Sequence, residues 1–335
     1  MVIKLIKDKE IWDRFIDQSY DSLLFHKWDF LKIMEKYTNS ELLSYGIYKG
    51  DALICAFPLF FKTYKGLKMI FSPPPRTGVN RLGFVMSREF ATLNQNKKEN
   101  YLTTVAGDFD QEIKKLSPNY VHIILIPNFL DVRPFRLNHG YTTDALYAYA
   151  FDLDLSLDEI WNGFGKSSRS DIKKTDSLGL KLLKGGDIST FYELMSGRYD
   201  DKCLNFSLRK NYIEELFKTY PDNLELYCLY DNDDNIVGGT INCKYKDTFW
   251  LWLGGMKTQK KAYYNEYMIW ELIKIAKNEG YKKVDWGGGP QKVTQFKSRF
   301  NPNLEIYFTI HKKDNFGKFA EWMFLSFIKK IDDVW

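Results

Sequence analysis

The sequence predicts a mixed α/β (α+β) protein in which one arrangement of helices and strands occurs twice. Each half of the 335-residue chain shows a helical pattern, two strand-like stretches broken at a charged turn, a second helical pattern and one more strand. Strand pairs that are joined by short turns and lie beside helices are typical of mixed sheets. The chain is also longer than one hydrophobic core usually supports. We therefore expect two tandem domains, residues 1–148 and 149–335, each a twisted mixed sheet flanked by helices.

The first half begins with an amphipathic helix over residues 27–37, because Trp28, Leu31 and Met34 recur at helical spacing. Residues 42–72 read as strands that are broken at 49–51 and at 65–66, where lysine and glycine form turns. A loop rich in Gly, Pro and Arg follows at 73–84. We expect a helix between residues 89 and 116 and a buried strand at 121–127.

The second half repeats this order. Ser156 and Glu159 have the spacing of a capping box, so a helix is expected to begin at Leu157. The other expected elements are a helical stretch at 188–219, strands at 224–231 and 236–255, a strong helix at 263–280 and a strand at 281–287 that runs into glycines. Gly280 occupies the usual position of a helix C-terminus.

Composition limits the classes of function. The chain is 44% hydrophobic and 27% charged, as soluble globular proteins are, and its formal charge of +5 suits an anionic ligand better than a dedicated nucleic-acid interface. Neither a disulfide framework nor a metal site is expected, since the cysteines and histidines show no ligand spacing. We find no signal peptide and no stretch of membrane-spanning length, so a cytoplasmic location is expected. The cysteines are Cys55, Cys203, Cys228 and Cys243, and the histidines are His26, His122, His139 and His311.

Gly165-Lys166-Ser167 has the form of the last residues of a phosphate-binding P-loop. That loop needs a glycine at position 160, which is Ile160, and it must open a helix, whereas a helix is expected to start before it. The pattern therefore argues against a nucleotide triphosphatase. In a helix, Lys166, Arg169 and Lys173 form one cationic stripe, which is either a solvated face or an anion-binding face.

Three stretches resemble the FemABX-like branch of the GNAT acyltransferase superfamily. Residues 151–180 resemble its segment of an acidic strand, a capped helix and a basic run, residues 284–300 resemble its strand with glycines followed by Phe-Lys-x-x-Phe, and residues 25–37 resemble its aromatic helix with a lysine four positions after a tryptophan. The matching residues are Trp28, Lys32, Trp161, Arg169, Ile172, Lys173, Lys174, Gly179, Leu180, Phe296, Lys297 and Phe300. Members of this branch carry two GNAT-like domains in one chain and form amide bonds, so the resemblance implies the same here.

The resemblance assigns Lys32 and Arg169 to the phosphates of the acceptor substrate, with Lys166 and Lys173 beside them. An arginine suits this task because its planar guanidinium can bind two phosphate oxygens at once. The acceptor is thus expected to be an anionic, phosphate-bearing molecule.

One catalytic candidate follows from the same resemblance, and the others follow from their positions in the sequence. The resemblance assigns Lys297 an electrostatic role near the reacting carbonyl, although an exposed turn lysine would explain the residue as well. Tyr264 is a candidate proton donor by its position, or else a packed helix residue. Gly287 and Gly288 either allow the backbone to approach a ligand closely or merely end a strand.

Trp250 and Trp252 belong to the strand before the strong helix. Alternation with a period of two places both on one face, where they either pack in the core or line an acyl channel. The segment that follows, residues 256–264, lacks the paired small residues with which acetyl-CoA enzymes bind pyrophosphate, and its lysines 257, 260 and 261 either meet donor phosphates or cap the helix.

The resemblance implies an N-acyltransferase that moves an aminoacyl group from aminoacyl-tRNA to an amine of a cell-envelope (peptidoglycan) precursor or similar acceptor, with no tightly bound cofactor and no metal. Two alternatives stay open. One is an acyl-CoA-dependent enzyme acting on a small amine, and the other is a catalytically silent doubled GNAT domain that binds nucleotides or RNA.

The C-terminal stretch, residues 316–335, has a helical pattern of apolar residues. Packing against the body of the protein is the favoured interpretation, and peripheral contact with the inner face of a membrane is the alternative. The residues that carry the pattern are Phe316, Phe319, Trp322, Met323, Phe324, Phe327 and Ile331.

Overall fold

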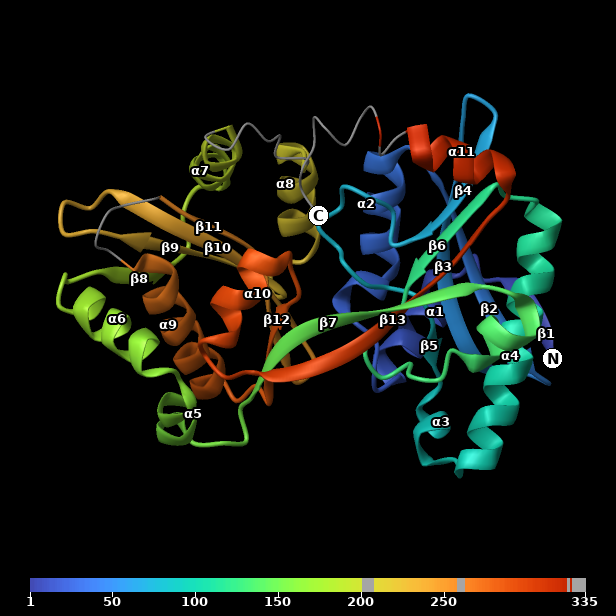
Figure 1. Ribbon diagram of the computed structural model, residues 1–335, viewed down its shortest axis with the longest axis horizontal. Helices are drawn as coiled ribbons and strands as arrows, with labels where there is room; N and C mark the ends of the chain where they lie inside the picture. The colour runs from blue at the N-terminus through green and yellow to red at the C-terminus, as the bar shows by residue number, and fades with distance from the viewer. Residues whose placement is uncertain (201–207, 258–262, 324–325, 327–335) are drawn as a thin grey trace. The chain divides into compact units, whose positions relative to one another are not determined.

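The computed structural model describes residues 1–200, 208–257, 263–323 and 326. Contacts group the chain into two compact units, one formed by residues 1–146 and the segment from Ile306 through α11, the other by residues 147–305 (Figure 1). The chain passes from the first unit to the second within β7 (Thr142–Asp152) and returns within β13 (Asn303–Lys313). The division into domains at residues 148 and 149 stays a prediction. The units are described one at a time.

The strands of the first unit lie in the order β1-β2-β3-β4-β6-β13, with β5 paired to β3. Neighbours are antiparallel except β4 and β6, which are parallel. The two predicted turns are confirmed, because Lys49 pairs with Ala52 and Tyr64 with Leu67 across them. The strands are β1 (Val2–Leu5), β2 (Glu41–Lys49), β3 (Ala52–Tyr64), β4 (Leu67–Ser72), β5 (Val85–Met86) and β6 (Tyr120–Ile124).

The core of the first unit is rich in aromatic rings. Phe84 lies 5.2 Å from Phe109 and 5.3 Å from Phe135, measured between ring centroids, and all three are buried. Such edge-to-face and tilted pairs fill space efficiently between a sheet and a helix. The expected helices at 27–37 and 89–116 are present. The helical elements are α1 (Lys9–Gln18), η1 (Leu24–His26), α2 (Trp28–Thr38), α3 (Arg88–Thr92), α4 (Gln95–Leu116), η2 (Pro134–Asn138) and α11 (Asn315–Met323).

The strands of the second unit lie in the order β7-β12-β11-β10-β9-β8. Here β11 and β12 are the parallel neighbours, and the remaining pairs are antiparallel. The boundaries expected at 224–231, 236–255 and 281–287 agree with the structure to within a few residues, whereas the strand at 181–184 was not predicted. The strands are β8 (Lys181–Lys184), β9 (Leu224–Tyr230), β10 (Ile236–Tyr245), β11 (Thr248–Met256) and β12 (Lys283–Gly287).

The helix predicted to begin at Leu157 does so, but it ends at Gly163 and a new helix begins at Lys166, so the expectation that one helix continues through Gly165-Lys166-Ser167 is wrong. The helix at 291–298 was not predicted. Glu159 N donates to Ser156 Oγ at 3.2 Å and Ser156 N donates to Glu159 Oε2 at 2.8 Å, so the capping box is confirmed. Leu272, Ile273 and Ala276 bury one side of the strong helix in the core. The helices are α5 (Leu157–Gly163), α6 (Lys166–Asp176), α7 (Ile188–Asp200), α8 (Lys210–Thr219), α9 (Tyr264–Asn278) and α10 (Gln291–Ser298).

Both units use the same connection. In each, a hairpin leads through a helical connection to a strand that runs parallel to the second strand of the hairpin. The connection from β4 to β6 contains β5, α3 and α4, and the connection from β11 to β12 contains α9. The predicted mixed α/β fold with a repeated plan is thus confirmed. Among the described helices, none has the length and apolar character needed to cross a membrane.

A buried carboxylate joins three strands of the second unit. Glu225, on β9, accepts hydrogen bonds from Lys184 of β8 at 2.5 Å, from Lys244 of β10, and from the Tyr227 hydroxyl at 3.1 Å. Burial alone would raise the pKa of Glu225, but the two lysines and the tyrosine outweigh it and hold the pKa below its ordinary value. The charged form is therefore the one that the fold stabilises.

We expect Glu225→Gln to reduce the acid sensitivity of folding. Because the pKa is lower in the folded state, the carboxylate stabilises the fold above the ordinary pKa of a glutamate, and that contribution is lost as the pH falls through the folded-state value. The free energy of unfolding in urea, measured between about pH 6 and pH 3, should decline less steeply in the variant. Glu214→Gln, at an exposed ion pair, serves as the control and should decline like the parent. Equal slopes in all three proteins would contradict the assignment.

Candidate active site

The second unit contains two parallel strands that pair over only part of their length. Thr248, Phe249 and Trp250 of β11 pair with residues 283–285 of β12, and no pair follows. β11 nevertheless continues to Met256, where it is still paired with Gly238 of β10 on its other side. Within the described residues, β11 thus extends past the end of its pairing with β12. Where two strands part, backbone groups can bind a ligand in place of a neighbouring strand.

An irregularity in β11 accompanies the divergence. Ile241 of β10 pairs with Leu253, and the next residue, Asn242, pairs with Leu251, so Trp252 is an extra residue in β11. A bulge of this kind bends a strand and increases its twist. It also interrupts the alternation that placed Trp250 and Trp252 on one face. Trp250 is buried and Trp252 is half-buried. The prediction that both side chains lie on the same face of the strand depends on regular alternation, which the bulge removes.

Lys297 of α10 binds the end of β12. Its buried ammonium donates to the carbonyl oxygens of Trp286, of Gly287 at 3.1 Å and of Gly288 at 2.8 Å, and lies 5.2 Å from the centroid of the Trp286 ring. The structure thus brings together three of the predicted residues, Lys297, Gly287 and Gly288. It places a cation at the carboxyl end of β12, beside the point where β11 and β12 part.

The glycines allow this arrangement. Gly287 has a φ of +62° and Gly289 a φ of +152°, which side-chain-bearing residues rarely adopt. The chain can therefore turn sharply enough for successive carbonyl groups to converge on one ammonium. The alternative interpretation, that Lys297 is an exposed turn residue, is wrong, because its side chain is buried.

Asp285 is a residue of this region that sequence reasoning missed. It is buried at the last position of β12 that pairs with β11, its Oδ1 accepts from Gly287 N at 2.9 Å, and its Oδ2 lies 3.9 Å from the Lys283 ammonium. A carboxylate two residues before a glycine turn is a common way to fix that turn, so Asp-Trp-Gly in the sequence was the available signal.

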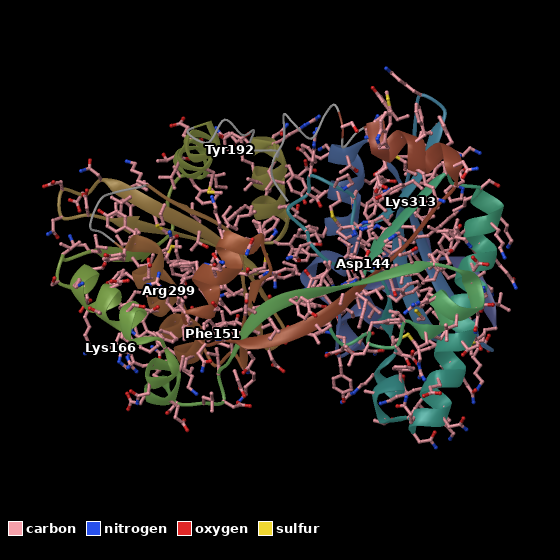
Figure 2. The ribbon with its side chains drawn as sticks, in the orientation of Figure 1. Asp144, Phe151, Lys166, Tyr192, Arg299 and Lys313 are labelled. Carbon is pink, nitrogen blue, oxygen red and sulfur yellow. The ribbon has the colours of Figure 1, made fainter. Side chains whose placement is uncertain are left out.

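Arg299 is the second missed residue, and it fixes α6. Its guanidinium lies 2.9 Å from Asp171 of α6 and 3.4 Å from Glu266 of α9, and its carbonyl accepts from Gly165 N at 2.8 Å and from Ser168 Oγ at 3.3 Å. Burial raises the pKa of Glu266, while Arg299 opposes that shift. Lys166 and Arg299 are labelled in Figure 2.

The contacts of Arg299 also explain why a glycine occupies the first position of the Gly-Lys-Ser motif. The Gly165 N–H is already bound to the Arg299 carbonyl, and a Cβ at position 165 would lie 2.9 Å from that same oxygen. The glycine is needed for close packing of α6 against the segment after α10. The backbone at this position therefore cannot cradle a phosphate.

The cationic stripe lies on the opposite side of α6. Lys166 and Lys173 are exposed and Arg169 is half-buried. Arg169 donates to the carbonyl of Asn162 at 2.9 Å, and the Lys173 ammonium lies 6.0 Å from the centroid of the Trp161 ring. The stripe is thus shaped by contacts with α5, and it presents Lys166 and Lys173 to solvent.

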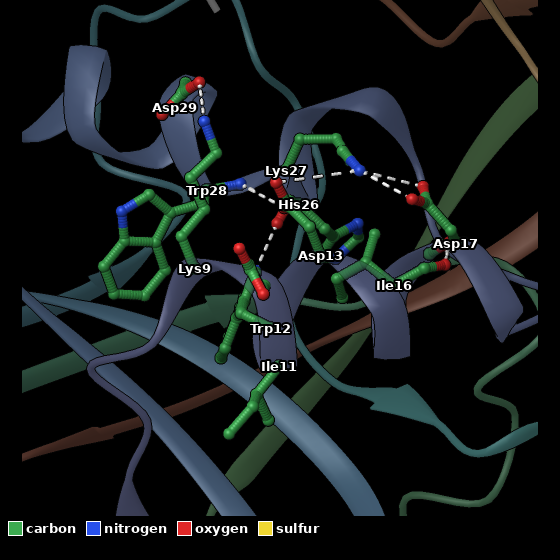
Figure 3. A network of polar contacts seen from close by, with 12 residues as sticks. Lys9, Ile11, Trp12, Asp13, Ile16, Asp17, His26, Lys27, Trp28 and Asp29 are labelled. Carbon is green, nitrogen blue, oxygen red and sulfur yellow. Dashed lines mark hydrogen bonds and ion pairs between the residues drawn. The ribbon is translucent and has the colours of Figure 1, made fainter.

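Lys32 lies in the first unit, on α2. It is exposed and ion-paired with Glu35, whose other oxygen accepts from Leu42 N at 2.7 Å. Contacts at the start of α2 hold the helix against α1: Trp28 N donates to Asp13 Oδ1 at 2.8 Å, and Lys27 lies 2.8 Å from Asp17 (Figure 3). The predicted phosphate contact of Lys32 stays a prediction.

Tyr264 is the first residue of α9 and is buried. Burial, with a smaller effect from the Asp231 carboxylate, raises the pKa of the Tyr264 hydroxyl, so it keeps its proton at neutral pH. Lysines 260 and 261 of the preceding segment lie outside the described residues. In the described part of the chain, no group of three or more His, Cys, Asp and Glu side chains could hold a metal ion.

Comparisons with known proteins agree with this geometry. The acetyltransferase (GNAT) domain family matches residues 166–298, the part of the chain from α6 through α10 that contains the diverging strands. No curated protein sequence matches the chain.

Solved structures of low sequence identity share the fold. FemX is 14% identical, with a TM-score of 0.67 over 92% of this chain and 97% of its own. The C-terminal domain of a putative lysylphosphatidylglycerol synthetase from Agrobacterium fabrum is 11% identical, with a TM-score of 0.58 over 98% and 99%. A tandem GNAT protein from the clavulanic acid biosynthesis pathway is 9% identical, with a TM-score of 0.52 over 93% and 98%. The expected tandem GNAT-like fold and its resemblance to the FemABX-like branch are confirmed at the level of the fold, and the domain match supports an acyltransferase.

We expect Lys297→Met to destabilise the protein by about 1–3 kcal/mol, because carbonyl groups at the end of β12 lose their donor. Urea unfolding measures the difference. Lys292→Met, at an exposed position of the same helix, should leave the free energy of unfolding within about 0.5 kcal/mol of the parent. A similar small effect at both positions would mean that the Lys297 contacts contribute nothing.

Proposed function

We propose that the second unit is an N-acyltransferase that holds an activated acyl group between β11 and β12 and transfers it to an amine. The observation that carries the proposal is the parting of these strands after Trp250 and Asp285, with the Lys297 cation beside the opening. Backbone N–H groups of β11 beyond its last pair with β12 are donors for the acyl carbonyl. A donor fixed in place before the reaction stabilises developing negative charge most effectively.

The chemistry follows from this placement. The neutral amine attacks the carbonyl carbon, and the carbonyl oxygen gains negative charge as a tetrahedral intermediate forms. The bond from that carbon to the donor's oxygen or sulfur then breaks, and the proton lost by the amine ends on the leaving atom. Lys297 contributes its positive field and keeps the glycine turn in place, since its N–H groups already bind carbonyl oxygens. The Tyr264 hydroxyl is proposed to protonate the leaving atom and to be reprotonated by the proton that the amine loses, so that the net transfer runs from the amine to the leaving atom.

For the donor we propose aminoacyl-tRNA, and for the acceptor an amine on a phosphate-bearing cell-envelope precursor, in the cytoplasm. Three features support this choice: the fold shared with FemX and with a putative lysylphosphatidylglycerol synthetase domain, the absence of paired small residues in the segment 256–264, and the exposed lysines of α6. Trp250 and Trp252 lie on β11 and are proposed to border the acyl site.

The acyl-CoA alternative keeps the same site with a different donor. We would distinguish the two by offering the purified protein a radiolabelled aminoacyl-tRNA or a radiolabelled acyl-CoA, each with a panel of amines, and by measuring label in amide products. Label from aminoacyl-tRNA alone supports the proposal, and label from acyl-CoA alone selects the alternative. A silent binding protein would give no product from either donor.

With the productive pair, we expect Lys297→Met to lower kcat by about 10²-fold to 10³-fold, the range typical of losing one electrostatic stabiliser. Lys292→Met is the control and should retain the parent kcat. Circular dichroism and thermal unfolding establish that each variant is folded at the assay temperature. Parental kcat in a folded Lys297→Met protein would remove this residue from the proposed site.

We expect Lys166→Ala, Arg169→Ala and Lys173→Ala to raise KM for a phosphate-bearing substrate, and to make KM less sensitive to salt, because fewer counterions are exchanged on binding. Lys174→Ala, on the same helix but off the stripe, is the matched control. Unchanged KM and salt dependence in all stripe variants would show that the stripe is only a solvated surface.

A further inference from the structure

Helix α11 is attached to the first unit by its small and polar side. Gly317 is buried, and a Cβ there would lie 2.1 Å from the carbonyl oxygen of Asn119. Gly317 N donates to Asp314 Oδ1 at 2.7 Å, and the Lys313 ammonium binds both oxygens of Glu321 at 2.6 and 2.7 Å. A close backbone contact and these ionic contacts together fix which side of the helix faces the protein.

The apolar side of α11 consequently faces solvent. Phe316 is 47% exposed, Phe319 54% and Met323 43%, and the three recur at i, i+3 and i+7 on one face. Trp322 is also exposed, with its ring 6.0 Å from that of Phe319. An ordinary surface helix turns such a stripe inward, so the expectation of packing against the body is wrong for these four residues. Phe324, Phe327 and Ile331 of the same pattern lie outside the described residues. A clustered exposed apolar stripe marks an interaction surface.

Exposed lysines occur on α11 itself, on the neighbouring strand β4 and in the turn before β4. α11 lies beside β4 (Figure 1), and Asn119 joins the two, because its side chain accepts from Lys68 N at 2.8 Å and donates to Asp314 Oδ2 at 2.8 Å. Lys65, Lys68 and Lys318 are exposed, and within the described residues they take part in no ion pair. The carboxylates of the segment, Asp314 and Glu321, are bound to the partners given above. The turn between β3 and β4 also exposes Tyr64.

We propose that the α11 surface, formed by Phe316, Phe319, Trp322, Met323 and the lysines at positions 65, 68 and 318, docks on an anionic lipid bilayer. Aromatic rings and a methionine suit the boundary between headgroups and acyl chains, and lysine ammonium groups reach lipid phosphates above it. A second copy of the chain fits less well, since a two-fold contact would bring the same lysines together. This inference does not depend on the proposed acyl transfer.

Cosedimentation with vesicles tests the proposal, using phosphatidylcholine alone or phosphatidylcholine with phosphatidylglycerol. The full-length protein should bind the anionic vesicles, more weakly at high salt. Phe319→Glu should lower the partition coefficient at least tenfold, and the Lys65→Glu, Lys68→Glu, Lys318→Glu triple variant should remove the preference for phosphatidylglycerol. The matched control is Leu137→Glu on η2, where the leucine is 73% exposed, and it should bind like the parent. Circular dichroism and thermal unfolding confirm that each variant is folded.

Three results would overturn the proposal. One is no sedimentation with anionic vesicles at low salt. Another is an equal loss of binding in Phe319→Glu and Leu137→Glu, because the contact would then be nonspecific. The third is self-association of the parent, seen by analytical ultracentrifugation without lipid and abolished by Phe319→Glu, because a second copy would then occupy the surface.

Discussion

One buried cation organises the end of β12. The Lys297 ammonium would be unfavourable inside the protein without acceptors, and carbonyl groups at the end of β12, where its pairing with β11 has ended, would be unfavourable there without donors. The ammonium donates hydrogen bonds to the carbonyl oxygens of Trp286, Gly287 and Gly288, so the donor and the acceptors all have partners. Because this contact ends β12 independently of β11, the neighbouring strand is free to diverge. The extra residue at Trp252 bends β11 at the same level.

The two units follow one plan but differ at this place. In the first unit, β4 pairs with β6 up to its last residue, Ser72, and Pro73, which has no N–H, follows. In the second unit, β11 extends six residues beyond its last pair with β12. Within the described residues, the second strand of the hairpin therefore extends well past its parallel partner in the second unit and not in the first. This difference, together with the matched acetyltransferase domain, is why we assign the reaction to the second unit.

The sequence allowed prediction of features that depend on near neighbours in the chain. The Ser156 capping box and the turns of the hairpins follow from spacing within a few residues, whereas the break between α5 and α6 at the Gly-Lys-Ser motif was not predicted. Features set by distant partners could not be predicted. The side chain and carbonyl of Arg299 bind residues more than a hundred positions away in α6, and the bulge at Trp252 is defined only by its register against β10. Lys297 was identified by resemblance, but its carbonyl partners required the fold.

Helix α11 shows the same limit more sharply. Its periodic apolar residues predict an amphipathic helix, and periodicity alone favours burying that side. In the structure, Gly317 determines which side of the helix faces the protein. A glycine inside a helix costs roughly 1 kcal/mol relative to alanine, so its presence calls for a compensating contact. The compensation is the close approach to Asn119, which no larger residue permits at the observed distance. Once the glycine side must face the protein, the aromatic side can only face outward. The exposure of the apolar stripe therefore follows from a specific backbone contact and is not a result of poor packing.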